Sequence, residues 1–384
     1  MQEKETRKTI RVFAIASFLN DLGSDMIYPL WPLFVTSVLH ANMSVLGFID
    51  GLSDAVVSIS QAVSGYLSDR IKKRKVFVWL GYLFGGLSRF GYFLSTTWQH
   101  LIPLRVLDRA GKIRGAPRDA IIADMSSQEN RGKNFGILRT MDNLGAVCGI
   151  ILAIFLIDIL GYRTLFLIAA IPSLIAVLLI FTLIKESKPS DTKIYKQISL
   201  KDISGNFRLF IVLSSIFAMG TFSYSFLLIY ARQYGFKVVF IPVLYLIFTA
   251  VTAIFSLPFG RLSDKVGRKT VIMFSFILWG IVCLIFILFQ SYWAIIVGFV
   301  MYGLHKGAIE PVQKAFVAEL APTEYRASGL GGFQMAVGLT ALPSSFIAGI
   351  LWDRISIYAP FYFSLSLTLV SIILLMFVKS NKPR

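Results

Sequence analysis

Cysteine and histidine are scarce in this sequence, which has 2 Cys and 3 His among 384 residues. Cys148 and Cys283 both lie in long apolar runs, so neither a disulfide framework nor a metal site is indicated. His40 and His100 lie in short polar segments, and His305 stands alone in its apolar run. An enzyme that catalyses a covalent reaction needs a nucleophile with an activating base, or metal ligands. We therefore expect no catalytic centre, no bound metal and no cofactor.

Charged residues are also few. Asp, Glu, Lys and Arg make up 15% of the chain, against roughly 25% in soluble domains. Several long runs contain none of them, at 164–184, 209–230, 238–260 and 270–292. A helix needs about 20 apolar residues to cross a bilayer. The sequence therefore predicts an all-α membrane protein.

Twelve transmembrane helices are predicted. Their approximate ranges are 12–38, 45–67, 76–95, 99–122, 135–157, 164–184, 208–233, 239–261, 270–289, 292–318, 328–352 and 357–378. The longest polar connection, 185–206, separates the first six spans from the last six. We expect an N-terminal half at 1–184, a cytoplasmic central loop at 185–206, and a C-terminal half at 207–384.

The net charge of +17 is spread unevenly along the chain. Basic clusters occupy the segments that share one side of the membrane in this topology, namely 4–11, 70–75, 185–208, 265–269 and 379–384. An excess of Lys and Arg marks the cytoplasmic side of a membrane protein, and such clusters bind anionic lipid headgroups. We expect a bacterial inner-membrane protein with both termini in the cytoplasm and no role in nucleic-acid binding.

The two halves carry the same motif. A shift of 195 positions places Gly65-Tyr-Leu-Ser-Asp69-Arg70 on Gly260-Arg-Leu-Ser-Asp264-Lys265. The same shift pairs Asp124 with Glu319, Arg131 with Arg326, Gly136 with Gly331 and Asp158 with Asp353. Agreement at one fixed offset over this length indicates an internal duplication.

With these residues the sequence resembles the major facilitator superfamily. Both motif copies continue into a basic tail, complete at Gly267-Arg268-Lys269, whereas Lys72 stands where the family usually has glycine. Arg105 is similar to the conserved arginine of the family's fourth helix. The resemblance implies secondary transport by two pseudo-symmetric six-helix halves, with the solute bound between them near the midplane. One feature departs from the exporters of the family: Gly149 is followed by Ile150 where they often have Gly-Pro.

The repeated motif is expected to form a clasp at the cytoplasmic rim. A glycine lets backbones approach closely, and an aspartate beside arginines makes charge-assisted hydrogen bonds. A solvated basic loop would have the same composition. The clasp residues predicted from both copies are Gly65, Asp69, Arg70, Arg131, Gly260, Asp264, Lys265, Arg268 and Arg326.

Several ionisable residues fall inside the predicted spans, where each costs about 2.5–3.5 kcal/mol unless it faces a cavity or a partner. Span 1 places Asp21, Asp25 and Tyr28 on one helical face, with Asp25 near the midplane. The remaining candidates for the cavity are Asp50 and Asp54 in span 2, Arg105, Asp108, Arg109 and Lys112 in span 4, Asp142 in span 5, and Lys306 and Glu310 in span 10.

Two interpretations of these charges stay open. Inside the predicted spans of the N-terminal half, acids and bases are equal in number, seven of each, as static pairing of buried charges requires. Alternatively, one or two acids exchange protons, since burial favours the neutral carboxyl group and an approaching cation favours the ionised one. For that role the candidates are Asp25 and Asp54, with Arg105 as the coupling cation.

The function predicted is proton-coupled transport of a small organic solute by a monomer in contact with membrane lipids, with export slightly favoured. Uptake of an organic anion or a siderophore-like metal chelate is the alternative, because the cations of span 4 can hold carboxylates. A membrane enzyme and a non-transporting sensor are the rival classes. A transporter moves labelled solute into vesicles without changing it, which separates these classes.

Overall fold

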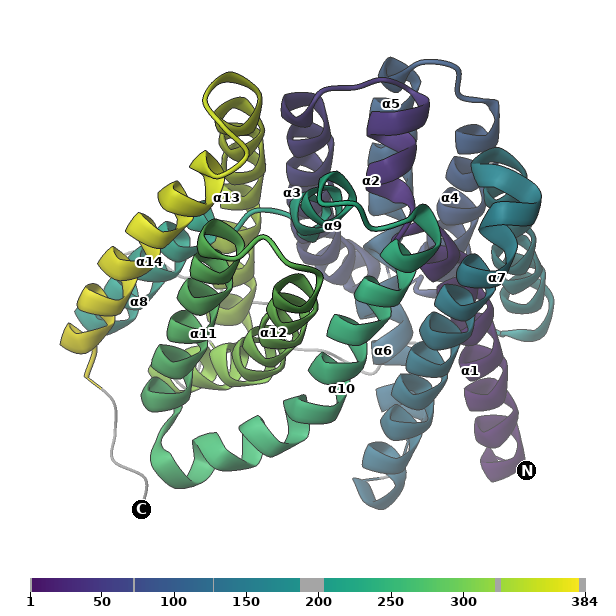
Figure 1. Ribbon diagram of the computed structural model, residues 1–384. Coiled ribbons are helices and arrows are strands. Elements are labelled where there is room, and N and C mark those ends of the chain that lie inside the picture. The colour runs from purple at the N-terminus through teal and green to yellow at the C-terminus, as the bar shows by residue number, and fades with distance from the viewer. Residues whose placement is uncertain (1, 72, 127, 187–203, 322–325, 380–384) are drawn as a thin grey trace. The chain divides into compact units, whose positions relative to one another are not determined.

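The computed structural model describes residues 2–71, 73–126, 128–186, 204–321 and 326–379. Every regular element in these ranges is a helix (Figure 1). Eight helical segments of the described residues are long and apolar enough to cross a membrane, and one of them, 132–183, contains two spans. The prediction of an all-α membrane protein is confirmed.

Contacts between Cα atoms divide the chain into two compact units. Unit 1 comprises Met1–Ala41 and Val56–Ile194, and unit 2 comprises Asn42–Ala55 and Tyr195–Arg384. These units differ from the predicted halves mainly at the start of span 2, because residues 42–55 group with the C-terminal part of the chain. Helix α3 (Met43–Ile71) is continuous and belongs to unit 2 in its first half and to unit 1 in its second.

The other helices of unit 1 form spans 1 and 3–6. They are α1 (Gln2–Ile27), α2 (Trp31–Leu33), the π-helix η1 (Phe34–Val38), α4 (Lys75–Leu94), α5 (Trp98–Ala110), the 3-10 helix η2 (Gly111–Arg114), α6 (Gly115–Met125) and α7 (Gln128–Leu183). Gly161, with φ of 68°, divides α7 into two spans. Span 4 is broken at η2, where the backbone of Gly111 approaches that of Gly81 in α4.

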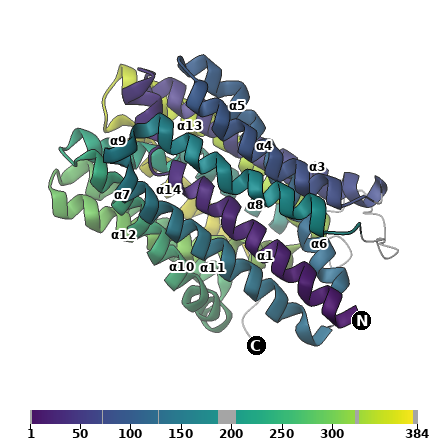
Figure 2. The same cartoon turned by 90° about the vertical axis from the view of Figure 1, so that its right-hand side faces the viewer.

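Small residues let α1 pack directly on α7, which runs alongside it (Figure 2). A Cβ atom at Gly145 or Gly149 would lie closer than 3.0 Å to a backbone oxygen of α1, that of Phe18 or Leu22. Both glycines therefore allow close packing of the two helices. Apolar side chains of α1, α4, α6 and α7 complete the core of unit 1, among them Phe13, Tyr82, Ile121, Leu138 and Ala176.

Unit 2 contains the remaining spans. Its helices are α8 (Gly205–Gly220), α9 (Tyr224–Gln233), the 3-10 helix η4 (Val238–Phe240), α10 (Ile241–Val266), α11 (Arg268–Leu288), α12 (Tyr292–Leu320), α13 (Arg326–Arg354) and α14 (Ala359–Phe377). Span 7 is interrupted between α8 and α9. The core is aromatic. Phe222 packs against Trp279 and Phe361, with ring centroids 5.7 and 5.3 Å apart, and Phe286 stacks on Phe361.

Candidate functional site

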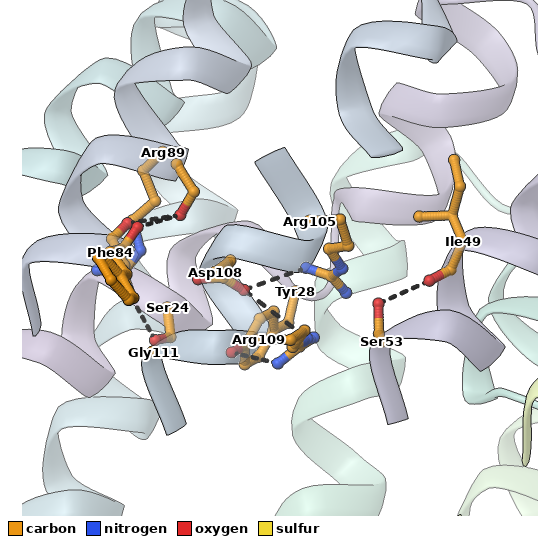
Figure 3. A network of polar contacts seen from close by, with 12 residues as sticks. Ser24, Tyr28, Ile49, Ser53, Phe84, Arg89, Arg105, Asp108, Arg109 and Gly111 are labelled. Atoms are coloured by element: carbon orange, nitrogen blue, oxygen red, sulfur yellow. Dashed lines mark hydrogen bonds and ion pairs between the residues drawn. The ribbon is translucent and has the colours of Figure 1, made fainter. Parts of the chain in front are cut away.

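A charged cluster lies on one face of α5 in unit 1 (Figure 3). Asp108 Oδ2 lies 3.7 Å from Arg105 Nη1 and 3.7 Å from Arg109 Nε, and all three side chains are largely buried. The spacing of one helical turn brings Arg105 to Asp108, so both arginines pair along their own helix. The sequence names these three residues as candidates for the cavity, but it does not reveal that they pair with each other.

Aromatic rings of span 1 hold the same two arginines. The guanidinium carbon of Arg105 lies 4.1 Å from the ring centroid of Trp31, and that of Arg109 lies 4.7 Å from the ring centroid of Tyr28. Arg109 Nη1 also donates a hydrogen bond of 2.8 Å to Tyr28 Oη. Desolvated cation–π contacts of this kind stabilise by about 2 kcal/mol or more. Both guanidinium groups are therefore fixed against the break between α1 and α2 in span 1.

Asp25 occupies α1 one turn before Tyr28 and lies among four charged side chains. Asp21, Lys112, Arg89 and Arg109 all lie within electrostatic range of its carboxyl group. Asp21 itself accepts a hydrogen bond of 2.9 Å from Asn20 Nδ2. The predicted acids of span 1 thus face the cations of spans 3 and 4 within unit 1, and a change of charge at Asp25 alters the balance of the cluster.

Arg89 of α4 is a member of this network that the sequence does not single out. Its side chain is buried, and its nitrogen atoms donate to Ser24 Oγ at 2.6 Å, to Asn20 Oδ1 at 3.3 Å, to the Ala169 carbonyl at 3.4 Å and to Ser173 Oγ. These partners belong to α1 and α7, so one guanidinium joins spans 1, 3 and 6. A lone arginine in an apolar span is the only signal in the sequence that points to it.

A second group of charges in unit 1 consists of static pairs. Arg118 lies 3.1 Å from Asp119 and 3.7 Å from Asp142, and it donates a hydrogen bond of 2.7 Å to Ser17 Oγ. Arg139 lies 3.5 Å from Asp142 and is largely exposed. The interpretation of mutual neutralisation fits Asp142 better than a role in proton exchange.

The acids at the start of α3 have partners in unit 2. Asp50 is buried and accepts a hydrogen bond of 2.7 Å from Ser223 Oγ and another from Ser225 Oγ. Asp54 and Glu310 both interact electrostatically with Lys306, whose Nζ lies 5.8 Å from the ring centroid of Tyr302. Within unit 2, Asp54, Lys306 and Glu310 therefore form one polar group.

The basic clasp has the same geometry in both units. Arg268 Nη1 donates at 2.9 Å to Glu319 and to the Ala315 carbonyl, and Arg74 pairs with Asp124. The next lysine donates to a backbone oxygen of the unit's last span, from Lys75 to Phe181 and from Lys269 to Met376, both at 2.8 Å. Asp124 and Glu319 are repeat equivalents, related by the shift of 195. Arg74 and Arg268 are related by a shift of 194, because the first loop is one residue longer than the second.

Some details of the predicted clasp need correction. Asp264 is largely exposed and lies 3.8 Å from Arg268, so Glu319 is the closer partner. A Cβ at Gly260 would have no described atom within 4 Å, so the close backbone approach expected there is wrong, and at Gly65 it would meet only Ala116 Cβ at 3.6 Å. Arg70 and Lys265 are exposed. The side chains of Asp69, Arg131 and Arg326 lie outside the described residues.

This arrangement predicts unequal effects of two neutralising substitutions at the clasp of unit 2. Glu319→Gln should slow transport several-fold with little change in solute affinity, because Arg268 loses its 2.9 Å partner and the clasp biases the conformational equilibrium without touching solute. Asp264→Asn should have a smaller effect, since exposed ion pairs contribute about 1 kcal/mol or less. The maximal rate and the binding affinity of each variant test this, and an equal loss of affinity and rate in Glu319→Gln would contradict it.

Comparisons with known proteins cover almost the whole chain. The family model described as Major Facilitator Superfamily matches residues 13–253 and 208–384. An MFS-type transporter of Methanocaldococcus jannaschii is 38% identical over 385 residues, which cover 98% of this chain and 96% of the relative. The quinolone resistance protein NorA of Staphylococcus aureus is 24% identical, with 98% of each chain covered.

Solved structures agree on the fold. The nucleoside transporter NupG superposes with a TM-score of 0.77 at 16% identity, covering 96% of this chain and 97% of its own. A bacterial homologue of the lysosomal transporter Spinster, in an inward-facing and unoccupied conformation, gives a TM-score of 0.72 at 13% identity, covering 97% and 95%. At these identities the likeness concerns the fold alone.

Proposed function

The chain belongs to the Major Facilitator Superfamily and is a multi-pass membrane transporter rather than an enzyme, and we propose that it exports a small organic solute in exchange for protons. The observation that carries the proposal is the position of Asp25 in unit 1. Its carboxyl group lies among Lys112, Arg89, Arg109 and Asp21, so that binding or release of one proton changes the net charge of a buried cluster.

The mechanism follows from mutual exclusion of proton and solute at this cluster. An ionised Asp25 offsets the positive charge of Lys112 and would admit a basic group of the solute, while protonation of Asp25 removes that offset and would expel the solute. We assign to Lys112 the coupling role for which the sequence suggests Arg105. Arg105 instead pairs with Asp108 and packs on Trp31. Proton release and solute release would then occur on opposite sides of the membrane, as exchange by alternating access requires.

The proposed setting is the cell membrane, with both termini in the cytoplasm. The basic clusters of the chain support this orientation through the positive-inside rule and would bind anionic headgroups. We propose a monomer, because each unit has its own apolar core and the solute path of this fold lies within one chain.

Export is the proposed direction because one relative is named a quinolone resistance protein, and resistance by a transporter means removal of the drug from the cell. A quinolone carries an aromatic ring system, which suits a site that includes Tyr28 and Trp31. A fluorescent quinolone is therefore the first probe to use.

Uptake of an organic anion or metal chelate is the second candidate. It is favoured by one observation, the placement of Arg105 and Arg109 against the same ring of Tyr28, at 5.7 and 4.7 Å from its centroid. Two guanidinium groups at one aromatic side chain form a site suited to a carboxylate.

Growth of a deletion strain on a panel of drugs, metabolites and iron sources tests the direction of transport. Export predicts increased sensitivity to at least one toxic compound and higher intracellular fluorescence of the quinolone, both reversed by the wild-type gene. Loss of growth on one anionic nutrient or iron chelate, with unchanged drug sensitivity, would contradict export and favour uptake.

A further inference from the structure

The first turn of α3 is capped by a side chain from another helix of unit 2. Asp353, in the last turn of α13, accepts hydrogen bonds from Met43 N at 3.1 Å, from Ser44 N at 2.7 Å and from Ser44 Oγ at 2.6 Å. The first N–H groups of a helix have no partner within the helix, and a carboxylate there is further stabilised by the helix dipole. The cap therefore ties α3 to α13.

Below this cap the two helices pack backbone against backbone. A Cβ atom at Gly349 of α13 would lie closer than 3.0 Å to the Met43 carbonyl oxygen. Gly47 and Gly51 of α3 approach Ser345 and Leu342 of α13 in the same way. Phe48 of α3 and Phe346 of α13 also pack edge to face here, with ring centroids 6.0 Å apart. Small residues thus bring the first turns of α3 into close contact with α13.

A second carboxylate belongs to α3 itself and binds the start of another helix. Asp50 of α3 accepts hydrogen bonds from Ser223 Oγ at 2.7 Å and from Ser225 Oγ at the start of α9. Ser223 is the N-cap of α9, and its own N–H donates to Ser345 Oγ of α13 at 3.2 Å. The start of α3 thus receives one carboxylate from α13 and supplies another to α9.

The division of α3 between the units gives these contacts a meaning for transport. Residues 42–55 group with unit 2, while the second half of α3 groups with unit 1. Alternating access in this fold moves one half of the protein against the other around a central site. Opening the side where α3 begins therefore requires that its first turns leave α13.

We propose that Asp353 and Asp50 form a carboxylate clasp that holds the transporter closed on the side where α3 begins, which is the outer side if the termini are cytoplasmic. Both are positioning residues for transport. In the closed state both carboxylates have hydrogen-bond partners. When the clasp breaks, that side opens and water hydrates the released carboxylates, so neither state leaves a charge in contact with lipid. The inference depends on the family membership and orientation, and not on proton coupling or export.

The repeat offers a matched control. Asp158 stands 195 residues before Asp353 and is exposed in unit 1. Asp158→Asn is the same chemical change as Asp353→Asn, made at the repeat-equivalent position outside the clasp. A second control is Cys283, which is buried in α11 and becomes reactive only if the whole unit loosens.

The experiment measures how fast a membrane-impermeant maleimide labels one cysteine in vesicles of both orientations. Ser345→Cys, in a chain with Cys148 and Cys283 replaced by alanine, reports on the α3–α13 contact. Asp353→Asn should speed its labelling about tenfold, as expected for loss of hydrogen bonds to a charged group, and only from the side opposite the termini. Ser44→Ala should give a smaller increase, and Asp158→Asn none.

An unchanged labelling rate in Asp353→Asn would overturn the proposal. An equal increase in the labelling rate for Asp158→Asn would also overturn it. So would faster labelling of Cys283 after Asp353→Asn in a chain that retains Cys283 as its only cysteine, because either result would show that the whole unit has loosened. No solute is needed, so the outcome is independent of whether the transporter exports or couples to protons.

Discussion

Replacing Asp25 by asparagine is expected to abolish accumulation of solute driven by a pH gradient while preserving exchange of solute down its gradient. The carboxamide keeps the shape of the side chain but cannot bind and release a proton. It fixes the cluster around Lys112 in one charge state, so proton binding no longer opposes solute binding and the carrier only equilibrates the solute. Uptake of the fluorescent quinolone into everted vesicles with an acid interior, compared with counterflow at equal pH, measures the two activities.

Asp21→Asn is the matched control for this substitution. Asp21 lies one turn earlier on the same face and accepts a hydrogen bond from Asn20; we expect its replacement to reduce transport in both assays together. If Asp25 were only a structural partner of the cations, its asparagine variant would fail to fold, because an uncompensated buried charge costs about 3–5 kcal/mol. A folded Asp25→Asn variant that still concentrates solute would contradict the assignment and favour Asp54.

Arg89→Met should be among the most destabilising single substitutions in unit 1. Methionine fills similar space, but four buried oxygen atoms on α1 and α7 lose a charged donor. Hydrogen bonds to charged groups contribute about 1.5–3 kcal/mol each, so we expect a loss of about 3 kcal/mol or more and a fall in melting temperature of about 10 °C in detergent.

Arg139→Met is the control for this change. Its side chain is 66% exposed and lies 3.5 Å from Asp142, and exposed pairs of this kind contribute about 1 kcal/mol or less. Thermal unfolding followed by size-exclusion chromatography measures both variants. Equal melting temperatures for wild type and Arg89→Met would contradict the view that this arginine holds spans 1, 3 and 6 together.

The course of the helices could be predicted from the sequence because it depends on local properties. Apolar runs of fixed length identify spans, and the repeated motif at 65–70 and 260–265 identifies the duplication. Gly145 and Gly149 lie one turn apart on one face and leave room for another backbone, but the sequence does not show that this backbone is that of α1.

The choice of partners could not be predicted in the same way. Helical spacing places Arg105, Asp108 and Arg109 on one face, but it does not decide whether Asp108 or an acid of span 1 pairs with them. Arg89 has neutral partners from two other helices, and Asp353 caps a helix 310 residues away. Such contacts depend on helix rotation and depth, which the periodicity of a single span does not determine.

Proton-coupled export is tested most directly by measuring the proton movement that solute causes in everted vesicles. With a fluorescent pH indicator and an imposed acid interior, addition of a solute identified by the growth panel should raise the internal pH in wild-type vesicles, and the Asp25→Asn variant should give no signal although it still exchanges labelled solute. Accumulation of solute that persists after an ionophore has collapsed the pH gradient, with no proton movement in wild-type vesicles, would contradict proton-coupled export.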